Sequence, residues 1–411
     1  MCRQSDGMET SPLSNMTPLV IHDLQDSQMF ALAQAAGRAG IPVCGTSNPL
    51  EAWVIKSRYV QKVVEIRSLS EVHAGMFALQ LKRSGLQGVW LPCVDDIVGW
   101  TAQHHALVRG LGFCFLVPDI SDIEKAREGQ WLEGGGLRKL QEWRIADAEL
   151  SQKALELPYP VLLKTTRGRY TCCESAEDLL RFRDQQASQG QHDSEHRLQA
   201  YISGGVERMA SAILLFDGEG RVVRGFTARR QRVESTRFGP FGESTAVCAE
   251  WIPELYEGAK TLLSQLHWRG FAEVECKQDA DGRWCVLEVN TRLSGWSCLA
   301  EADGAGLLQA YYALCMGKQL EEACLQKSTS RYVRMIATCY HEPDWNVPKP
   351  ETMRWGRRVV RIWQRMCEYR RVYPYLLAGA WDMRDLRASV MIAWSTVKRV
   401  WRMDRRRPTR V

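Results

Sequence analysis

The stretch GFAEVECKQDADGRWCVLEVNTRLSG, residues 270–295, carries the most informative pattern in this 411-residue chain. Residue character alternates along 271–277 and again along 284–290, with Asp281 and Gly282 between the two segments. Alternating segments on either side of an Asp-Gly pair are typical of antiparallel strands joined by a tight turn. We therefore predict a β-hairpin here.

The predicted hairpin sorts its polar side chains, because alternate residues of a strand point to the same face. Glu273, Glu275 and Lys277 share a face of the first strand, and Glu288 and Asn290 share a face of the second. Carboxylate and amide oxygens from neighbouring strands form the oxygen-only type of site that suits Mg²⁺. We predict that Glu275, Glu288 and Asn290 bind this ion. A solvated surface hairpin is the alternative.

This stretch resembles the nucleotide site of the ATP-grasp enzymes. Members of that superfamily place Glu or Asp on one strand and E-x-N-x-R on the next, here Glu275 and then EVNTR at 288–292. The sequence resembles that of the carboxylate–amine ligase branch related to the large subunit of carbamoyl-phosphate synthase, over residues 18–312. The resemblance implies ATP with Mg²⁺ or Mn²⁺. It also implies that Arg292 steadies the moving charge, because a guanidinium can hold a phosphoryl group or a carboxylate.

Composition indicates a globular chain of two or three domains. Charged residues make up 25% and hydrophobic residues 45%, which are ordinary values. The 14 cysteines show no repeated C-x-x-C pairs and favour reduced thiols. We find no signal-peptide pattern and no apolar run of the roughly 18–20 residues that span a bilayer. These features predict a cytoplasmic protein.

The order of elements and the resemblance together predict the domain organisation. Strand, helix and strand patterns alternate from Pro18, which predicts a doubly wound α/β domain. An ATP-grasp domain and a basic, Trp-rich helical extension follow, so the predicted fold class is α/β and α+β. The predicted parts are a disordered 1–17, the α/β domain 18–119, the ATP-grasp domain 120–340 (nucleotide lobe 120–204, metal and catalytic lobe 205–340) and the extension 341–411.

Three local patterns give further expectations. Residues 101–109 predict one helix of the first domain, and the charged segment 120–156 predicts helical structure interrupted at 134–136. His192 and His196 stand four residues apart, but their polar surroundings favour a surface loop over a metal site.

The phosphate side of the nucleotide site is expected at LPYPVLLK, residues 157–164. This apolar strand ends in Lys164 and resembles the family's P-V-x-x-K, which implies that Lys164 contacts the α- and β-phosphates. A lone strand-end lysine is otherwise an ordinary solvated terminus.

The base side is expected at RLQAYISG, residues 197–204, which is similar to the family's hinge. The resemblance implies that Ala200, Tyr201 and Ile202 lie at the adenine ring and that Glu207 accepts hydrogen bonds from the ribose. A plain core strand is the alternative.

Two features depart from the family pattern. Where relatives carry an early phosphate-binding lysine, the nearest residue is Gln130, with Lys125 and Lys139 as the candidate replacements. The loop after Lys164 contains one glycine and two arginines, Arg167 and Arg169, where relatives have a glycine-rich cover. A degenerate nucleotide-binding scaffold is therefore an alternative to an active enzyme.

A cationic cluster occurs in ARRQRVESTRFGPFGES, residues 228–244. Its sequence resembles the R-K-x-R motif of the family, which implies that Arg230 and Arg232 contact the γ-phosphate or the acid substrate. Clusters of this kind are otherwise usually solvated.

The end of the chain differs electrostatically from the rest. From Arg331 onward there are 19 Lys and Arg against 7 Asp and Glu, a net charge of +12, which leaves −6 for the first 330 residues. Within 385–402, apolar residues recur every three or four positions, which predicts an amphipathic helix. Packing against the enzyme body is the first interpretation, and contact of residues 354–407 with an anionic membrane surface or an acidic partner is the second. The apolar positions are Leu386, Val390, Trp394, Val397 and Trp401.

The resemblance predicts an ATP-dependent ligase that joins a small-molecule carboxylate to an amine through an acylphosphate. A carboxylase or a thiol ligase would use the same site. No module for specific nucleic-acid binding is recognised, and a homodimer is left open.

Overall fold

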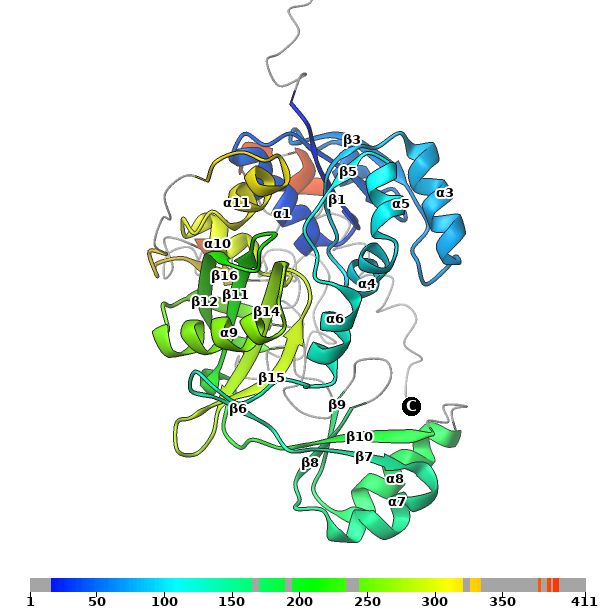
Figure 1. Cartoon of the computed structure of the whole chain (residues 1–411), viewed down its shortest axis with the longest axis vertical. Coiled ribbons are helices and arrows are strands. Elements are labelled where there is room, and N and C mark those ends of the chain that lie inside the picture. Colours follow the sequence, from blue (N-terminus) through cyan, green and yellow to red (C-terminus); the bar gives the residue numbers. More distant parts are fainter. Residues whose placement is uncertain are drawn as a thin grey trace, which may run out of the picture. The chain divides into compact units, whose positions relative to one another are not determined.

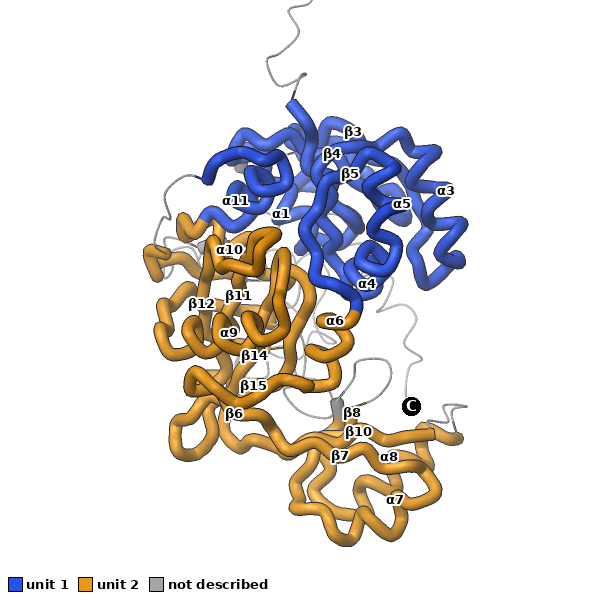
Figure 2. The backbone as a smooth tube through the Cα atoms, viewed as in Figure 1, with its two compact units in different colours: residues 1–120, 306–322, 380–411 blue, residues 121–305, 323–379 orange. Residues whose placement is uncertain are grey.

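The structure, a computed structural model, describes residues 16–164, 170–188, 194–233, 244–320, 326–333, 376–377, 383–385 and 387–391. The chain divides into two compact units, coloured separately in Figure 2. Unit 1 comprises residues 1–120, 306–322 and 380–411, and unit 2 comprises residues 121–305 and 323–379. Helices and strands occur in both units (Figure 1), which confirms the predicted mixed fold class.

Unit 1 is built on an open parallel sheet. The side chains of its strands β1, β2 and β4 are all buried, as expected where helices cover both faces of a parallel sheet. Short apolar runs such as LVI and GVWL form these strands. The α/β fold predicted for this part of the chain is thus confirmed. The sheet order is β3-β2-β1-β4-β5, with β1 (Leu19–Ile21), β2 (Val43–Ser47), β3 (Val60–Glu65), β4 (Gly88–Leu91) and β5 (Phe113–Cys114).

The helices of unit 1 begin and end at local signals. Asp26 precedes the first helix, and its carboxylate accepts hydrogen bonds from the backbone N–H groups of Gln28 and Met29 at 2.7 and 3.3 Å. The single helix predicted over 101–109 is instead divided between two helices, because His104 leaves the helical conformation (φ −111°, ψ 33°). The helices are α1 (Ser27–Arg38), α2 (Ala52–Ile55), α3 (Ala74–Ser84), α4 (Asp95–Gln103) and α5 (His105–Gly110).

A helix from much later in the sequence also belongs to unit 1. This is α11 (Leu307–Cys315), which the sequence-based division assigns to residues 120–340. The Tyr311 hydroxyl donates to the Trp90 carbonyl at 2.7 Å, and the Tyr312 hydroxyl donates to the Thr17 carbonyl at 2.6 Å. These long-range hydrogen bonds join α11 to the start of the chain.

The described residues of the C-terminal extension that belong to unit 1 are anchored there by the buried carboxylate of Asp385. Its Oδ2 accepts from Ser57 Oγ at 2.6 Å and from Gln34 Nε2 at 3.2 Å, and its Oδ1 accepts from the backbone N–H of Arg58 at 2.9 Å. This contact agrees with the packing interpretation of the extension. The other interpretation concerns 354–407, of which only 376–377, 383–385 and 387–391 are described.

The apolar face predicted for the extension is only partly within the described residues. In the short helical segment 387–391, Ala388 and Ser389 are fully buried, whereas Val390 is 50% exposed. At Val390 the packing interpretation therefore fails, and the small side chains of Ala388 and Ser389 are buried instead. The other predicted positions, Leu386, Trp394, Val397 and Trp401, lie outside the described residues.

We expect Asp385→Ala to destabilise unit 1 by about 2–3 kcal/mol, because the change leaves two buried side-chain donors and one partly buried backbone donor without their charged acceptor. Hydrogen exchange of peptides covering 29–36 and 53–60 measures this local stability. Asp385→Asn is the matched control, since it keeps an acceptor oxygen and is expected to lose less protection. Equal protection in wild type and Asp385→Ala would contradict the anchoring role.

Unit 2 contains a small antiparallel sheet in the order β7-β10-β8-β9. Its core includes Ile145, Leu163 and Leu198 from the strands and Leu150 and Leu179 from the helices. The helical prediction for 120–156 is wrong at two strands, β6 and β7. Their alternating pattern is too short to be recognised within a segment rich in charged residues. The elements are α6 (Ile120–Arg127), β6 (Leu137–Lys139), β7 (Glu142–Ala146), α7 (Asp147–Lys153), η2 (Ala154–Glu156), β8 (Val161–Lys164), β9 (Tyr170–Cys173), α8 (Ala176–Ser188) and β10 (Glu195–Ala200).

The second sheet of unit 2 has eight strands in the order β17-β16-β13-β12-β11-β14-β15-β6. Helix α9 (Pro253–Gln265) packs Leu255, Ala259 and Leu262 against strand residues such as Ala212 and Val274. One face of α9 is therefore apolar and covers this sheet. The remaining elements are η3 (Val206–Arg208), β11 (Met209–Phe216), β12 (Val222–Val233), β13 (Ser244–Ala249), β14 (Gly270–Gln278), β15 (Trp284–Asn290), α10 (Cys298–Ala302), β16 (Arg331–Val333), β17 (Leu376–Leu377) and, in unit 1, η5 (Met383–Asp385).

The predicted hairpin is confirmed as the antiparallel pair β14 and β15. Gly282 adopts φ +79° in the connecting turn, a conformation that favours glycine. Glu275 pairs with Glu288 and Glu273 pairs with Asn290, after which the register shifts at Leu287. The hairpin therefore brings the predicted metal ligands side by side. Among the described helices, none is both long and apolar enough to cross a membrane.

Candidate nucleotide site

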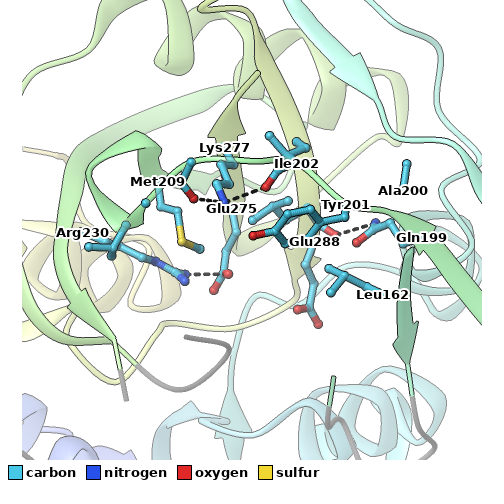
Figure 3. A pocket seen from close by; sticks show the side chains of 14 residues that line it. Leu162, Gln199, Ala200, Tyr201, Ile202, Met209, Arg230, Glu275, Lys277 and Glu288 are labelled. Atoms are coloured by element: carbon cyan, nitrogen blue, oxygen red, sulfur yellow. Dashed lines mark hydrogen bonds and ion pairs between the residues drawn. The ribbon is translucent and has the colours of Figure 1, made fainter. Parts of the chain in front are cut away.

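A pocket in unit 2 lies where the small sheet, the eight-stranded sheet and the segment connecting them meet (Figure 3). Its empty volume is about 830 Å³, including the part that opens to solvent. One side is mainly apolar and the other carries charged side chains from β12, β14 and β15. The lining residues are Leu162, Gln199, Ala200, Tyr201, Ile202, Gly204, Gly205, Val206, Met209, Arg230, Glu275, Lys277, Leu287 and Glu288.

The charged side of the pocket contains the two predicted metal carboxylates. Figure 3 shows the carboxylates of Glu275 and Glu288 directed to the same side of the hairpin. Asn290 lies next to them, with its Nδ2 3.2 Å from Glu275 Oε1 and 3.3 Å from Glu273 Oε2. Glu288 is exposed, whereas Asn290 is only 7% exposed. The structure thus brings the predicted set together at the pocket.

This donor set fits Mg²⁺ that arrives with a nucleotide. Such an ion takes one or two carboxylates from the protein and completes its coordination with water and phosphate oxygens. Within the described ranges, no group of three or more His, Cys, Asp or Glu side chains is arranged to hold a metal. Two carboxylates and an amide oxygen therefore suit a metal–nucleotide complex better than a free, fully protein-bound ion.

Arg230 is paired with the first of these carboxylates. Its Nη2 lies 2.5 Å from Glu275 Oε2, and its side chain is 7% exposed. Arg230 belongs to β12, so it reaches past β11, where the short side chain of Ser211 stands opposite Glu275. Burial lowers the pKa of Arg230, but the carboxylates of Glu275 and Glu273 outweigh burial and raise it. Arg230 is a fixed cation beside the predicted metal site.

Glu273 is a completely buried carboxyl group. The sequence places it on the same strand face as Glu275 but indicates no function for it. Burial, with the charge of Glu275 second, raises its pKa to about 8. The cations of Arg230 and Arg292 oppose this rise without cancelling it. Its Oε1 makes no hydrogen bond, although the nearby Ser211 hydroxyl also favours the ionised form. Burial therefore favours the protonated form of Glu273 in the folded protein.

The apolar side of the pocket contains the residues predicted for the adenine ring. Ala200, Tyr201 and Ile202 all line it, at the point where β10 ends and the connecting segment begins. Leu162 and Leu287 face them from β8 and β15. Glu207 does not line the pocket: its Oε1 accepts from the Gly205 N–H at 3.1 Å. Its predicted contact with the ribose stays a prediction.

The predicted phosphate lysine is held by an acidic partner. Lys164 Nζ lies 3.1 Å from Glu142 Oε1 on β7, and Gln199 Nε2 donates to the same oxygen at 2.9 Å. Lys164 is outside the residues that line the pocket. Neither Glu142 nor Gln199 has a sequence signal of its own, because the contact joins three strands.

The two remaining predicted arginines also lie outside the lining residues. Arg232 Nε donates to Thr245 Oγ1 at 3.0 Å, and Arg292 Nη1 donates to the Leu293 carbonyl at 3.2 Å. Arg292 is close enough to Glu273 to lower the pKa of that carboxyl group. Their predicted contacts with phosphate or acid stay predictions.

Two of the positions that depart from the family pattern, Lys125 and Gln130, have local partners. Lys125 pairs with Asp122 at 2.8 Å, and Gln130 Nε2 donates to Glu128. Lys139 belongs to β6, beside β15. Arg167 and Arg169 lie outside the described residues.

The prediction of a surface loop at the histidine pair is wrong for His196. This residue is a buried member of β10, and its Nε2 lies 2.8 Å from Asp147 Oδ1. Pairing of β10 between β7 and β8 buries the strand. His192 lies outside the described residues.

Comparison with known proteins agrees with this geometry. The family described as carbamoyl-phosphate synthase L chain, ATP binding domain, matches residues 243–323, which include the hairpin. No curated protein matches the sequence. Many solved structures match the fold at low identity.

Three of these structures are representative. A biotin carboxylase from Campylobacter jejuni has a TM-score of 0.57 at 14% identity, covering 77% of this chain and 74% of that one. The biotin carboxylase domain of Hydrogenobacter thermophilus 2-oxoglutarate carboxylase, solved with MgADP and bicarbonate, has a TM-score of 0.57 at 17% identity, with the same coverage. An L-amino acid ligase from Bacillus licheniformis has a TM-score of 0.53 at 16% identity, covering 73% and 74%.

These likenesses are to the fold, and the family match falls on the strands that hold the predicted metal ligands. The chain therefore has the ATP-grasp fold, and its hairpin lies within the stretch that the family model matches.

Proposed function

We propose that this protein is an ATP-dependent ligase that joins a small-molecule carboxylate to an amine and forms an amide or peptide bond. The observation that carries the proposal is the pairing of Glu275 with Glu288, beside Asn290, at the edge of a pocket whose other side is apolar. A nucleotide has these two requirements in one molecule: an apolar compartment for its base and a charged one for its phosphates.

In this proposal the base of ATP lies against Ala200, Tyr201 and Ile202. Lys164 exchanges its contact with Glu142 for the α- and β-phosphates, since phosphate oxygens carry more negative charge than one carboxylate. Glu275, Glu288 and Asn290 would hold Mg²⁺ or Mn²⁺, which would neutralise charge on the phosphate oxygens.

The chain's own cations have separate tasks. Arg292 steadies charge on the group being transferred. Arg230, buried and paired with Glu275, acts by holding that carboxylate in place. The predicted contact of Arg232 is with the γ-phosphate or the acid substrate. Preorganised charges of this kind supply most of the rate in phosphoryl transfer.

The proposed reaction has two steps. An oxygen of the substrate carboxylate attacks the γ-phosphorus, the bond from that phosphorus to the bridging oxygen breaks, and an acylphosphate and ADP form. The amine nitrogen then attacks the acyl carbon, phosphate leaves, and the nitrogen loses a proton. ATP turnover should therefore depend on both the carboxylate substrate and the amine substrate.

We expect ADP release in the presence of ATP and Mg²⁺ to rise when pools of carboxylic acids and amines are added together. Mass spectrometry of the mixture should detect a new amide. Release stimulated by bicarbonate, or by a thiol in place of the amine, would instead identify a carboxylase or a thiol ligase. Nucleotide binding without release under any of these conditions would refute the ligase and favour the scaffold alternative.

A further inference from the structure

Lys277 places a charged group in the otherwise apolar base compartment of the pocket. It is on β14, two residues after Glu275, and only 9% of its surface is exposed. The ammonium lies 5.5 Å from the centre of the Tyr201 ring, within the range of a cation–π interaction. Burial lowers the pKa of Lys277. A methionine would fill this position without the cost of desolvating a charge. The presence of an ammonium group therefore indicates that it makes interactions that offset this cost.

The ammonium binds the segment that connects the two sheets of unit 2. Lys277 Nζ donates to the Ile202 carbonyl at 2.9 Å and to the Gly204 carbonyl at 2.7 Å, as Figure 3 shows in part. Only the three-residue turn η3 gives the segment regular structure before β11 begins, so it has few backbone hydrogen bonds of its own. The buried carbonyl of Ile202 requires a donor, and Lys277 supplies it while also binding the carbonyl of the exposed Gly204.

The backbone conformation at Gly204 also restricts this segment. Gly204 has φ +98°, which L side chains rarely adopt, and an added Cβ would lie 2.7 Å from Arg208 Cδ. The segment therefore has one conformation that depends on Lys277 and on Gly204. That conformation sets where Tyr201 and Ile202 stand in the pocket.

We propose that Lys277 is a positioning residue of the nucleotide site, which holds residues 201–205 in the conformation that receives the base of ATP. The inference rests on the proposed function, because it takes the occupant of the pocket to be a nucleotide. Lys277 acts on binding of the base and not on the transferred phosphoryl group, so it should control KM for ATP more than kcat.

The test compares Lys277→Met, Lys277→Arg and Gly204→Ala with wild type by calorimetric titration with MgATP and by steady-state kinetics. Lys277→Met keeps the length of the side chain and removes both hydrogen bonds, so we expect its Kd and KM for ATP to rise about ten- to a hundredfold with kcat nearly unchanged. Lys277→Arg keeps donors and should recover part of the affinity. Gly204→Ala disturbs the same segment without changing any charge and should weaken binding similarly.

Lys260→Met is the matched control, because Lys260 is an exposed lysine of α9 paired with Glu257, away from the pocket. Wild-type affinity in Lys277→Met would overturn the inference and leave the proposed function standing. If Lys277→Met fails to fold, Gly204→Ala takes its place in the test. Wild-type affinity for MgATP in Gly204→Ala would then overturn the inference and leave the proposed function standing. A wild-type protein that binds no MgATP would refute the proposed function itself.

Discussion

Glu288→Ala is expected to lower ATP turnover by about a thousandfold while unit 2 stays folded. Glu288 stands opposite Glu275 in the hairpin and directs its carboxylate into the pocket. Removing it leaves one of the two predicted metal carboxylates, and charge stabilisation provides most of the rate in phosphoryl transfer. The side chain is exposed, so its loss removes little packing.

Three measurements test this expectation. ADP release gives turnover, titration with Mg²⁺ gives the metal dependence, and thermal unfolding with circular dichroism reports the fold. Glu257→Ala is the control, since Glu257 is an exposed acid on α9 that is remote from the pocket. Wild-type turnover in Glu288→Ala would remove the metal assignment from the hairpin.

Glu273→Gln is expected to stabilise unit 2 at pH 8 by an amount of the order of 3–5 kcal/mol, and to have little effect at pH 5. The folded-state pKa of Glu273 is about 8, against an ordinary value of 4.5. Between these two values the folded protein binds more protons than the unfolded chain does. Stability from this group is therefore present at low pH and is lost as the pH rises toward 8. Glutamine resembles the protonated acid and has no such loss.

Urea unfolding of both proteins between pH 5 and 8, with EDTA present to exclude metal ions, measures this difference. Hydrogen exchange along β11 and β14 assigns the change to unit 2. The wild-type stability should fall relative to that of Glu273→Gln as the pH rises. Parallel pH profiles for the two proteins would show that Glu273 is already ionised when folded, and that Arg230 and Arg292 compensate its charge fully.

The hairpin illustrates what short-range pattern can establish. Alternation on both sides of an Asp-Gly turn has a period of two residues, which is the period of a strand. That period alone puts Glu273 and Glu275 on one face of the first strand, and Glu288 and Asn290 on one face of the second. The resemblance to ATP-grasp enzymes extended this prediction to Lys164 and to residues 200–202, and the pocket is lined by the latter but not by Lys164.

The predictions failed where a weak local pattern was outweighed by pairing with distant strands. Strands β6 and β7 have three and five residues in a charged segment, and their partners are β15 and β10. His196 became a buried strand residue for the same reason. In each case the hydrogen bonds that decide the structure join residues far apart in the chain.

The sequence by itself determined the hairpin, the face that carries the carboxylates and the class of fold, because these follow from periodicity, turn chemistry and a motif within a short segment. Only the tertiary structure decided that Arg230 pairs with Glu275, that Lys277 binds the carbonyls of residues 202 and 204, and that Asp385 is anchored beside Ser57. Each of these contacts joins residues separated by tens to hundreds of positions, and their energies depend on burial and on exact distance. Neither quantity has a signature in the order of the residues.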